Sequence, residues 1–396
     1  IDKKGYPIVK VQKDRKNAGF SLGQERFTTL GKSKGGIWPI PITYFSYLAG
    51  NGKEARILLE KKNGVIKDEA DWIKLNYGQK GFYRVKYEKE MLEKLGKAYR
   101  DGILDDAEGC GIESDLYNML RARQIGLDDY LSFIKEYMME PSYPLNMQIA
   151  GHIMGLNNIT YSTEQNKKIR ELGLLYFKKA LDKLGLNPKK NEDEFSSMFR
   201  PSVITGLGIL GDEKIAEFAK ENIEKAIKGD IDPNIRNAIY FVSAWNGDKE
   251  VFEMLKNAYI KEEFPEKKVY LLLSLGFFKE EQLCKEALEF SLSKHVKLQD
   301  SFYVASEVAS NPANKWILLD WVEKNWNELR SRFGAGNHIL PRFVSVFSSY
   351  YGYEKLNEIK RFFTNKKNYT PMIKKDLDET LESIEINTLF MEHIRK

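Results

Sequence analysis

One stretch of the sequence, DWIKLNYGQKGFYRVKYEKEMLEKL at residues 71–95, changes its hydrophobic period part-way along. Between Ile73 and Tyr87, apolar and polar residues alternate on both sides of the glycine-bounded loop Gly78–Gly81, which is typical of paired β-strands with one buried face. The apolar residues that follow are spaced three and four apart, as on a helix. We therefore expect a β-hairpin that ends near Lys86 and a helical region after it.

Residues 1–86 predict a small antiparallel β-sandwich. Short alternating segments recur there with turn residues between them, and about seven such strands fit the stretch. Asn63-Gly64 is the strongest two-residue hairpin signal in this region, because both residues accept a positive φ. Pro39 and Pro41 cannot donate ladder hydrogen bonds, so the segment around them is expected to begin at a sheet edge.

Residues 87–396 predict a large all-α domain. Apolar stripes of about 10 to 20 residues alternate with short breaks, which matches ordinary helix and loop lengths. The clearest helix is expected over Asn311–Phe333, with Asn311 as its N-cap and Pro312 in its first turn. Successive helix pairs of this size stack into a HEAT- or armadillo-like superhelix. The fold class is therefore mainly α, with domains at 1–86 and 87–396.

The charge and cysteine content exclude several classes of partner. The chain of 396 residues carries a net charge of +5, from 62 basic and 57 acidic residues that are interspersed. Such mixing indicates a solvated surface, so no nucleic-acid partner is expected. No apolar run is long enough to span a bilayer, so no membrane partner is expected either. Cys110 and Cys284 lie far apart without metal-ligand spacing, which favours a reducing, cytoplasmic compartment, with a disulfide between the two as the alternative.

Read alone, the sequence contains no self-contained catalytic or metal site. A zinc peptidase needs two His residues four apart on one helix, with a Glu as base, and His152, His295, His338 and His393 have no such spacing. No phosphate-binding loop and no G-x-S-x-G turn occurs. Cys110 has no neighbouring partner that would mark it as a nucleophile. We expect no catalytic residue and no metal ligand in this chain.

Six short motifs follow one another along the chain in a recognisable order and spacing: GYPIVKV (5–11), QERF (24–27), WPIPITY (38–44), DWIKLNYGQKGFYRVKY (71–87), ILLDWVEKNWNELRSRFGAG (317–336) and EIKRFF (358–363). In this order and spacing they resemble the C-terminal half of zinc metallo-aminopeptidases of the puromycin-sensitive type, which include the archaeal tricorn-interacting aminopeptidases. The resemblance covers essentially the whole chain. One segment departs from it: the family usually has an Asp-Arg pair at the start of the helical domain, whereas this chain has DDAEGCGIESDLY at 105–117.

The resemblance implies an enzyme in two parts. In the family, an N-terminal β domain and a thermolysin-like catalytic domain precede the sandwich and the helical domain. The zinc cofactor, its His-Glu-x-x-His ligands and the Gly-x-Met-Glu-Asn amine-binding segment belong to that preceding part. This chain, which begins mid-sandwich at Ile1, is therefore expected to be a fragment of a zinc aminopeptidase, inactive alone and without zinc. The implied partners are the catalytic domain of the same polypeptide, peptide substrates and a larger protease complex.

The resemblance also implies that the helical domain closes over the active site and forms the wall of the substrate chamber. A peptide along this wall presents a free carboxylate, which favours an Arg or Lys partner. The family often has an Arg on the helix after the Gly-rich turn, and Arg342 in GAGNHILPRF (334–343) matches it. Arg342 and His338 are therefore the predicted substrate-binding residues. The structural alternatives are that Arg342 pairs with a neighbouring helix and that His338 caps one.

Tyr83 and Arg84 also match family positions and are expected to be structural, with Tyr83 in the sandwich core and Arg84 in an ion pair.

A competing hypothesis for the chain is a HEAT-like scaffold that binds a protein partner and has no enzymatic role. A nucleic-acid scaffold would need one strongly basic face, and the interspersed charges argue against it.

Overall fold

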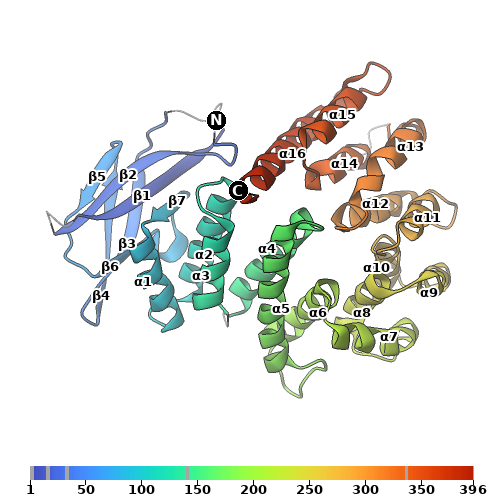
Figure 1. Ribbon diagram of the computed structural model, residues 1–396, viewed down its shortest axis with the longest axis horizontal. Helices are drawn as coiled ribbons and strands as arrows, with labels where there is room; N and C mark the ends of the chain where they lie inside the picture. The colour runs from blue at the N-terminus through green and yellow to red at the C-terminus, as the bar shows by residue number, and fades with distance from the viewer. Residues whose placement is uncertain (1–3, 15–17, 32–34, 140–141, 335–337, 396) are drawn as a thin grey trace. The chain divides into compact units, whose positions relative to one another are not determined.

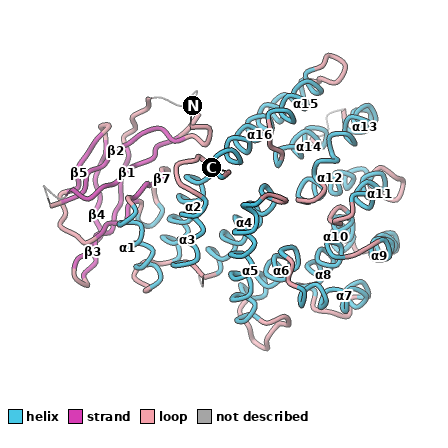
Figure 2. The backbone as a smooth tube through the Cα atoms, in the orientation of Figure 1, coloured by secondary structure: helices cyan, strands magenta, loops and turns pink. Residues whose placement is uncertain are grey.

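The computed structural model describes residues 4–14, 18–31, 35–139, 142–334 and 338–395. Contacts between residues divide the chain into two compact units, Ile1–Ile149 and Ala150–Lys396. Strands occur at the beginning of the first unit, and helices form most of the rest (Figure 1; Figure 2). The predicted mainly-α fold is therefore confirmed. The Gly-rich turn expected at 334–336, before the helix of Arg342, lies partly outside the described residues.

The described residues of the first unit form seven strands in two sheets. The strands are β1 (Tyr6–Asp14), β2 (Gly19–Phe27), β3 (Ile40–Leu48), β4 (Asn51–Leu59), β5 (Asn63–Ile66), β6 (Trp72–Leu75) and β7 (Arg84–Tyr87). One sheet has the order β5-β2-β1-β7 and the other the order β4-β3-β6. Adjacent strands are antiparallel except β1 and β7, which run parallel with Val9 opposite Val85. This one parallel pair departs from the purely antiparallel sandwich that the sequence predicted.

The hairpin predicted around Gly78–Gly81 is wrong. β6, before the loop, pairs with β3, whereas β7, after it, pairs with β1 in the other sheet. The connection therefore crosses from one sheet to the other, and positive φ values at Asn76, Gly78 and Gln79 turn the chain there. Alternation reports that a strand has one buried face, but it does not identify the strand's partner.

The hairpin predicted at Asn63-Gly64 is also wrong, because β4 pairs with β3 while β5 pairs with β2. The tight turn between β3 and β4 is instead Ala49-Gly50, where both residues have a positive φ, as a two-residue hairpin turn of this kind requires. Asn63 and Gly64 are the first two residues of β5 itself.

Three helices complete most of the first unit: α1 (Lys89–Arg100), α2 (Asp106–Arg121) and α3 (Leu127–Tyr137). α1 packs on β6, and α2 packs on β7 and on the 3-10 turn η1 (Tyr77–Gln79). The change from strand to helix falls between Tyr87 and Lys89, as the hydrophobic period predicted. The domain boundary at residues 86 and 87 stays a prediction, because compactness does not show which part folds by itself.

The second unit contains paired helices in two layers. After α4 (Tyr143–Thr160), which crosses the limit between the units, the described helices are α5 (Glu164–Leu184), α6 (Glu194–Leu210), α7 (Glu213–Lys228), α8 (Pro233–Asn246), α9 (Lys249–Lys261), α10 (Pro265–Leu275), α11 (Glu281–Ser291), α12 (Ser301–Ser310), α13 (Leu318–Phe333), α14 (Ile339–Ser345), α15 (Tyr353–Thr364) and α16 (Lys374–Ile394). α5 packs on α6, α7 on α8, α9 on α10 and α11 on α12, while α6, α8, α10, α12 and α14 contact one another in succession (Figure 1). This stacking agrees with the predicted superhelix.

Gly and Asp residues in the short connections between these helices explain where the helices end and begin. Gly211 and Gly229 follow α6 and α7 in the left-handed conformation, which Gly adopts at low cost at a helix C-terminus. The carboxylates of Asp212 and Asp248 accept backbone N–H groups at the starts of α7 and α9. Within the described residues, none of the helices has the length and apolar character that crossing a bilayer requires.

One helix start was predicted wrongly. α13 begins at Leu318, after the 3-10 turn η3 (Lys315–Ile317), and not at Pro312. The Asn311 side-chain oxygen does accept the N–H groups of Ala313 and Asn314, so Asn311 caps the turn that precedes the helix instead of the helix itself.

Candidate functional site

The two predicted substrate-binding residues lie at the start of α14. His338 immediately precedes the helix, and its exposed side chain makes no capping hydrogen bond. Arg342 is also exposed, and its guanidinium carbon lies 5.9 Å from the ring centre of Phe302 on α12.

Arg342 is an exposed cation that rests against an aromatic ring. In the part of the chain that the structure describes, no carboxylate forms an ion pair with it, so the alternative that it pairs with a neighbouring helix has no support there. Contact with an aromatic face restrains a guanidinium group while leaving its N–H donors exposed. An incoming carboxylate could therefore form charge-assisted hydrogen bonds with Arg342.

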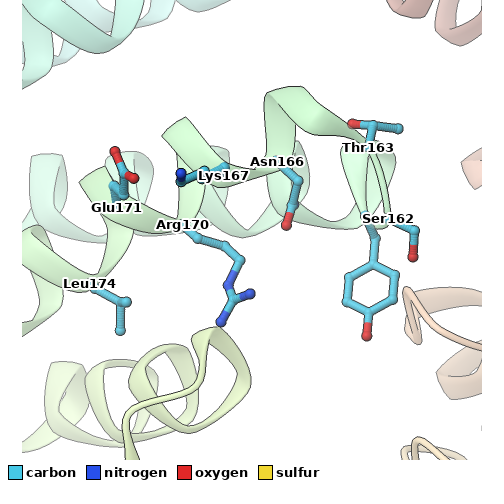
Figure 3. A pocket seen from close by; sticks show the side chains of 8 residues that line it. Ser162, Thr163, Asn166, Lys167, Arg170, Glu171 and Leu174 are labelled. Atoms are coloured by element: carbon cyan, nitrogen blue, oxygen red, sulfur yellow. The ribbon is translucent and has the colours of Figure 1, made fainter.

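A cavity of about 490 Å³ lies beside the start of α5 and is lined by eight residues between Tyr161 and Leu174. In Figure 3 the side chain of Arg170 extends from α5 toward a neighbouring loop, while that of Glu171 extends from the opposite side of the helix. The volume falls within the range of roughly 300–1,000 Å³ that is usual for ligand pockets. Most of the lining residues have polar side chains, among them Lys167, Arg170 and Asn166.

Arg170 is held at the edge of this cavity by the end of α6. Its Nε and Nη2 atoms donate to the carbonyl oxygen of Leu210 at 3.2 and 2.8 Å. Beside it, the ring of Tyr161 contacts that of Trp245 with centres 6.0 Å apart. The Lys279 Nζ atom lies 5.0 Å from the Trp245 ring centre. Arg170 on α5 and Lys279 in the turn between α10 and α11 are far apart in sequence, so no local motif could have indicated them.

Lys315 is a second notable cation, and it is buried. Its Nζ atom donates to the backbone and side-chain oxygens of Asn158, each at 3.0 Å, and to the carbonyl oxygen of Ser349 at 3.3 Å. Burial lowers the pKa of Lys315 to about 7. These bonds connect the end of α4 to elements near the end of the second unit, which is a structural role and not a catalytic one.

The first unit has two ion pairs between its strands and α2. Arg84 Nη1 lies 3.1 Å from Asp115 Oδ1, so the predicted ion pair is confirmed. Tyr83 is buried, and its place in the sandwich core stays a prediction. Burial raises the pKa of Asp115 to about 6, against the opposing effect of Arg84. Deeper in the unit, the Nζ atom of Lys74 lies 2.7 Å from a carboxylate oxygen of Glu108. Glu108 belongs to the segment at 105–117 where the sequence departs from the family pattern.

The residues present do not fit a catalytic zinc ion. Among the described residues, no group of three or more His, Cys, Asp or Glu side chains is arranged to hold a metal, so no step through zinc is assigned to this chain. Burial raises the pKa of Cys110 to about 11 and that of Cys284 to about 12. Both are therefore thiols at neutral pH, and the thiolate is the nucleophilic form.

A family model described as the ERAP1-like C-terminal domain matches residues 72–386 of the chain. The chain belongs to this family. The resemblance predicted from its motifs is thereby confirmed. The matched residues include the last strands β6 and β7 and the layered helices from α1 to α15.

The chain is similar over nearly its whole length to several curated proteins. It is 28% identical to Aminopeptidase M1 of Arabidopsis thaliana, over 99% of the chain and 47% of that protein. It is 27% identical to Tricorn protease-interacting factor F2 of Thermoplasma acidophilum, over 97% of the chain and 46% of that protein. Probable aminopeptidase 2 of Sulfurisphaera tokodaii is 27% identical, over 92% of the chain and 44% of that protein. The chain thus spans about half the length of the curated relatives it matches.

Proposed function

We propose that this ERAP1-like C-terminal domain is the non-catalytic portion of a zinc aminopeptidase that removes N-terminal residues from short peptides. The observation that carries the proposal is the alignment of 99% of the chain with 47% of a protein named Aminopeptidase M1. Zinc, its ligands and the hydrolytic steps are assigned to the portion of the enzyme that this alignment leaves out.

The second unit is proposed to form the wall of the substrate chamber and to close over the active site. Stacked helices offer a broad, continuous surface, and closure of such a wall excludes bulk water and positions the substrate. On this wall, Arg342 would bind a carboxylate of the peptide and His338 would donate or accept a hydrogen bond beside it. Both side chains are exposed, Arg342 on α14 and His338 immediately before it, which supports this assignment.

The proposed partners are the catalytic domain of the same polypeptide, peptide substrates and a larger protease complex. The last is suggested by the relative named Tricorn protease-interacting factor F2. The cytoplasm is the proposed compartment, because Cys110 and Cys284 are both free, as is usual where thiols are kept reduced.

Hydrolysis of an aminoacyl chromogenic substrate in the presence of zinc tests the proposal. The chain alone should be inactive, and mixing it with the zinc-binding half of the same enzyme type should restore or alter activity. In the mixture of the two halves, Arg342→Met should reduce kcat/KM roughly tenfold for peptides with a free C-terminus, because a charge-assisted bond is lost. The reduction should be smaller for the same peptides with an amidated C-terminus. Zinc-dependent activity of the chain alone would show that the assignment of roles is wrong.

The layered helices also favour a second function, a HEAT-like scaffold that binds a protein partner without an enzymatic role. Surfaces of stacked helical repeats commonly bind other proteins. This alternative expects a stable complex with a folded partner and no change in peptide hydrolysis on mixing with a zinc-binding half. The same experiment therefore separates the two functions.

A further inference from the structure

A groove in the first unit combines apolar side chains with several carboxylates. It is a cavity of about 330 Å³ between α1 and α3, which pack against each other and on α2 (Figure 1). Its volume lies within the range that is usual for ligand pockets. All the residues that line it belong to the first unit, so its shape depends on that unit alone.

One face of each helix builds the two walls of this groove. The lining residues are spaced three and four apart on both helices, which places them on a common face. They are Lys89, Leu92 and Glu93 on α1, and Asp129, Ser132, Phe133 and Glu136 on α3. The helices approach closely at Gly96, where an added Cβ would lie 2.6 Å from the ring of Tyr137. A larger residue would push the helices apart there, so this contact sets the width of the groove.

The inner part of the groove is apolar. Leu116 of α2 and Phe133 of α3 are buried beneath it, and Leu92 and Ile125 are half-buried along it. The ring of Phe133 contacts that of Tyr137, with ring centres 5.0 Å apart. Covering such partly exposed apolar side chains removes them from water, which favours the binding of an apolar group.

The rim of the groove is negatively charged, although the whole chain carries a net charge of +5. Glu93, Asp129 and Glu136 are exposed there, and Lys89 is the single cation among the lining residues. In the described part of the chain, neither Glu93 nor Glu136 forms an ion pair. Burial and the charges of Glu136 and Glu93 raise the pKa of Tyr137, which shows that the negative charge extends to the groove's aromatic side.

Helix stability explains only one of these carboxylates. Asp129 accepts a backbone N–H group at the start of α3, where a negative charge is favoured. Glu136 lies in the last turn of the same helix, where a negative charge is unfavourable. Arg100 at the end of α1 does not neutralise it, because its Nε atom lies 3.6 Å from a carboxylate oxygen of Asp101. A cation from outside the chain would therefore improve the electrostatics of the groove.

We propose that this groove binds a segment of another protein in which Lys or Arg side chains lie next to apolar ones. The apolar side chains would cover Leu92 and Ile125, and the cations would pair with Glu93 and Glu136. Tyr137 adds a ring face for a cation, as it already does for Arg100 at 5.7 Å. Like charges would exclude an acidic segment. This recognition is independent of the peptide hydrolysis proposed above.

Isothermal titration calorimetry of the chain with three matched decapeptides tests the groove. The first peptide contains two Leu and two Arg residues among Ala and Ser, the second has Gln in place of Arg, and the third has Ser in place of Leu. All three are acetylated and amidated, so they have neither the free carboxylate that Arg342 would bind nor the free amino group of an aminopeptidase substrate. We expect the first peptide to bind roughly tenfold more tightly than either of the others.

Variants of the rim locate the effect. Glu93→Gln/Glu136→Gln should abolish the preference for Arg over Gln in the peptide, because both ion pairs are lost. The matched control is Glu90→Gln/Glu224→Gln, which removes two exposed carboxylates that pair with lysines outside the groove. It should bind like the wild type. Thermal unfolding of every variant shows whether the fold is intact.

A variant of Lys89 tests the sign of the charge effect. Lys89→Gln removes the cation from the rim, so it should tighten the binding of the Arg-containing peptide. A residue that only supported the fold would not improve binding when it is replaced. The preference for Arg should also weaken as the salt concentration rises, because the rim is exposed and its charges are screened.

Each outcome decides the proposal. Equal binding of the three peptides, or an unchanged preference in the folded variant Glu93→Gln/Glu136→Gln, would overturn it. If the zinc-binding half displaces the Arg-containing peptide on mixing, the groove is covered within the enzyme, so a separate partner is wrong while the proposed function gains support. If the peptide stays bound in the mixture, the groove is open to a separate protein, as proposed.

Discussion

Glu307 on α12 is a half-buried carboxylate, and burial raises its pKa from 4.5 to about 8. Between these two values the folded state binds more protons than the unfolded state. Stability therefore falls as the pH rises through this window. Glu307→Gln removes the titrating group, so the variant should gain stability relative to the wild type as the pH increases from about 5 to about 8.

Urea unfolding at several pH values across this window measures the effect. Glu224→Gln is the matched control, because Glu224 is an exposed carboxylate on α7 that pairs with Lys228, and exposed pairs contribute little to stability. The control should follow the wild type at every pH. A constant difference between Glu307→Gln and the wild type would show that Glu307 titrates normally in the folded protein.

At the residue scale, the sequence could indicate a site only where a local pattern exists. Arg342 could be singled out because it lies within a recognisable segment, and the structure places it exposed on α14. Arg170 and Lys279 lie in unrelated segments, on α5 and after α10, which are connected through the packing of α5 on α6, α6 on α8 and α8 on α10. Contacts of this kind depend on tertiary packing, which hydrophobic periodicity does not report.

At the scale of elements, α2 is joined to the sandwich by a buried ion pair. The side chains of Lys74 on β6 and Glu108 on α2 are 2% and 1% exposed. Glu108 also accepts hydrogen bonds from Gly78 N–H and Gln79 Nε2 in the η1 turn. Glu108→Gln leaves the Lys74 charge unpaired in the interior, which should cost about 3–5 kcal/mol of unfolding free energy.

The double variant Lys74→Met/Glu108→Leu is the informative comparison for this joint. Replacing both charges by apolar groups of similar volume removes the unpaired charge, so the double variant should be more stable than Glu108→Gln. Urea unfolding of the two variants and the wild type checks this. If the double variant is the less stable of the two, the polar contacts to Gly78 and Gln79 dominate the joint and the charge of Lys74 does not.

The ends of an element could be predicted where neighbouring residues determine them. The pairing of a strand could not be predicted, because it depends on residues far away in the sequence. Asp212 and Asp248 begin helices and Gly211 ends one, because caps depend on the residues next to them. Both predicted hairpins failed, since β5 and β7 pair with strands in the sheet opposite to that of their chain neighbours β4 and β6. The sequence pattern of a strand shows which of its faces is buried, but it does not show which strand it pairs with.

At the scale of the helical unit, the contacts of Lys315 join segments that are far apart in the sequence. Its ammonium group binds Asn158 near the end of α4 and the carbonyl of Ser349. Asn158 in turn donates to the carbonyl oxygen of Ser310 at the end of α12. A stack of helices that touched only sequential neighbours would lack such long-range bonds. Among the residues that the structure describes, no carboxylate pairs with this buried cation, so its charge opposes folding.

This cost gives the unit a pH dependence of definite sign. Burial lowers the pKa of Lys315 from 10.5 to about 7, so the unfolded state binds more protons between these values and stability rises with pH across them. The stability of the wild type relative to Lys315→Met should therefore increase from pH 7 to pH 10, by at most about 1.4 kcal/mol per pH unit. Lys324→Met, which removes an exposed cation paired with Glu289, should show no such trend in urea unfolding. If the difference in unfolding free energy between the wild type and Lys315→Met does not change with pH, the three oxygen acceptors stabilise the ammonium group enough to offset its burial.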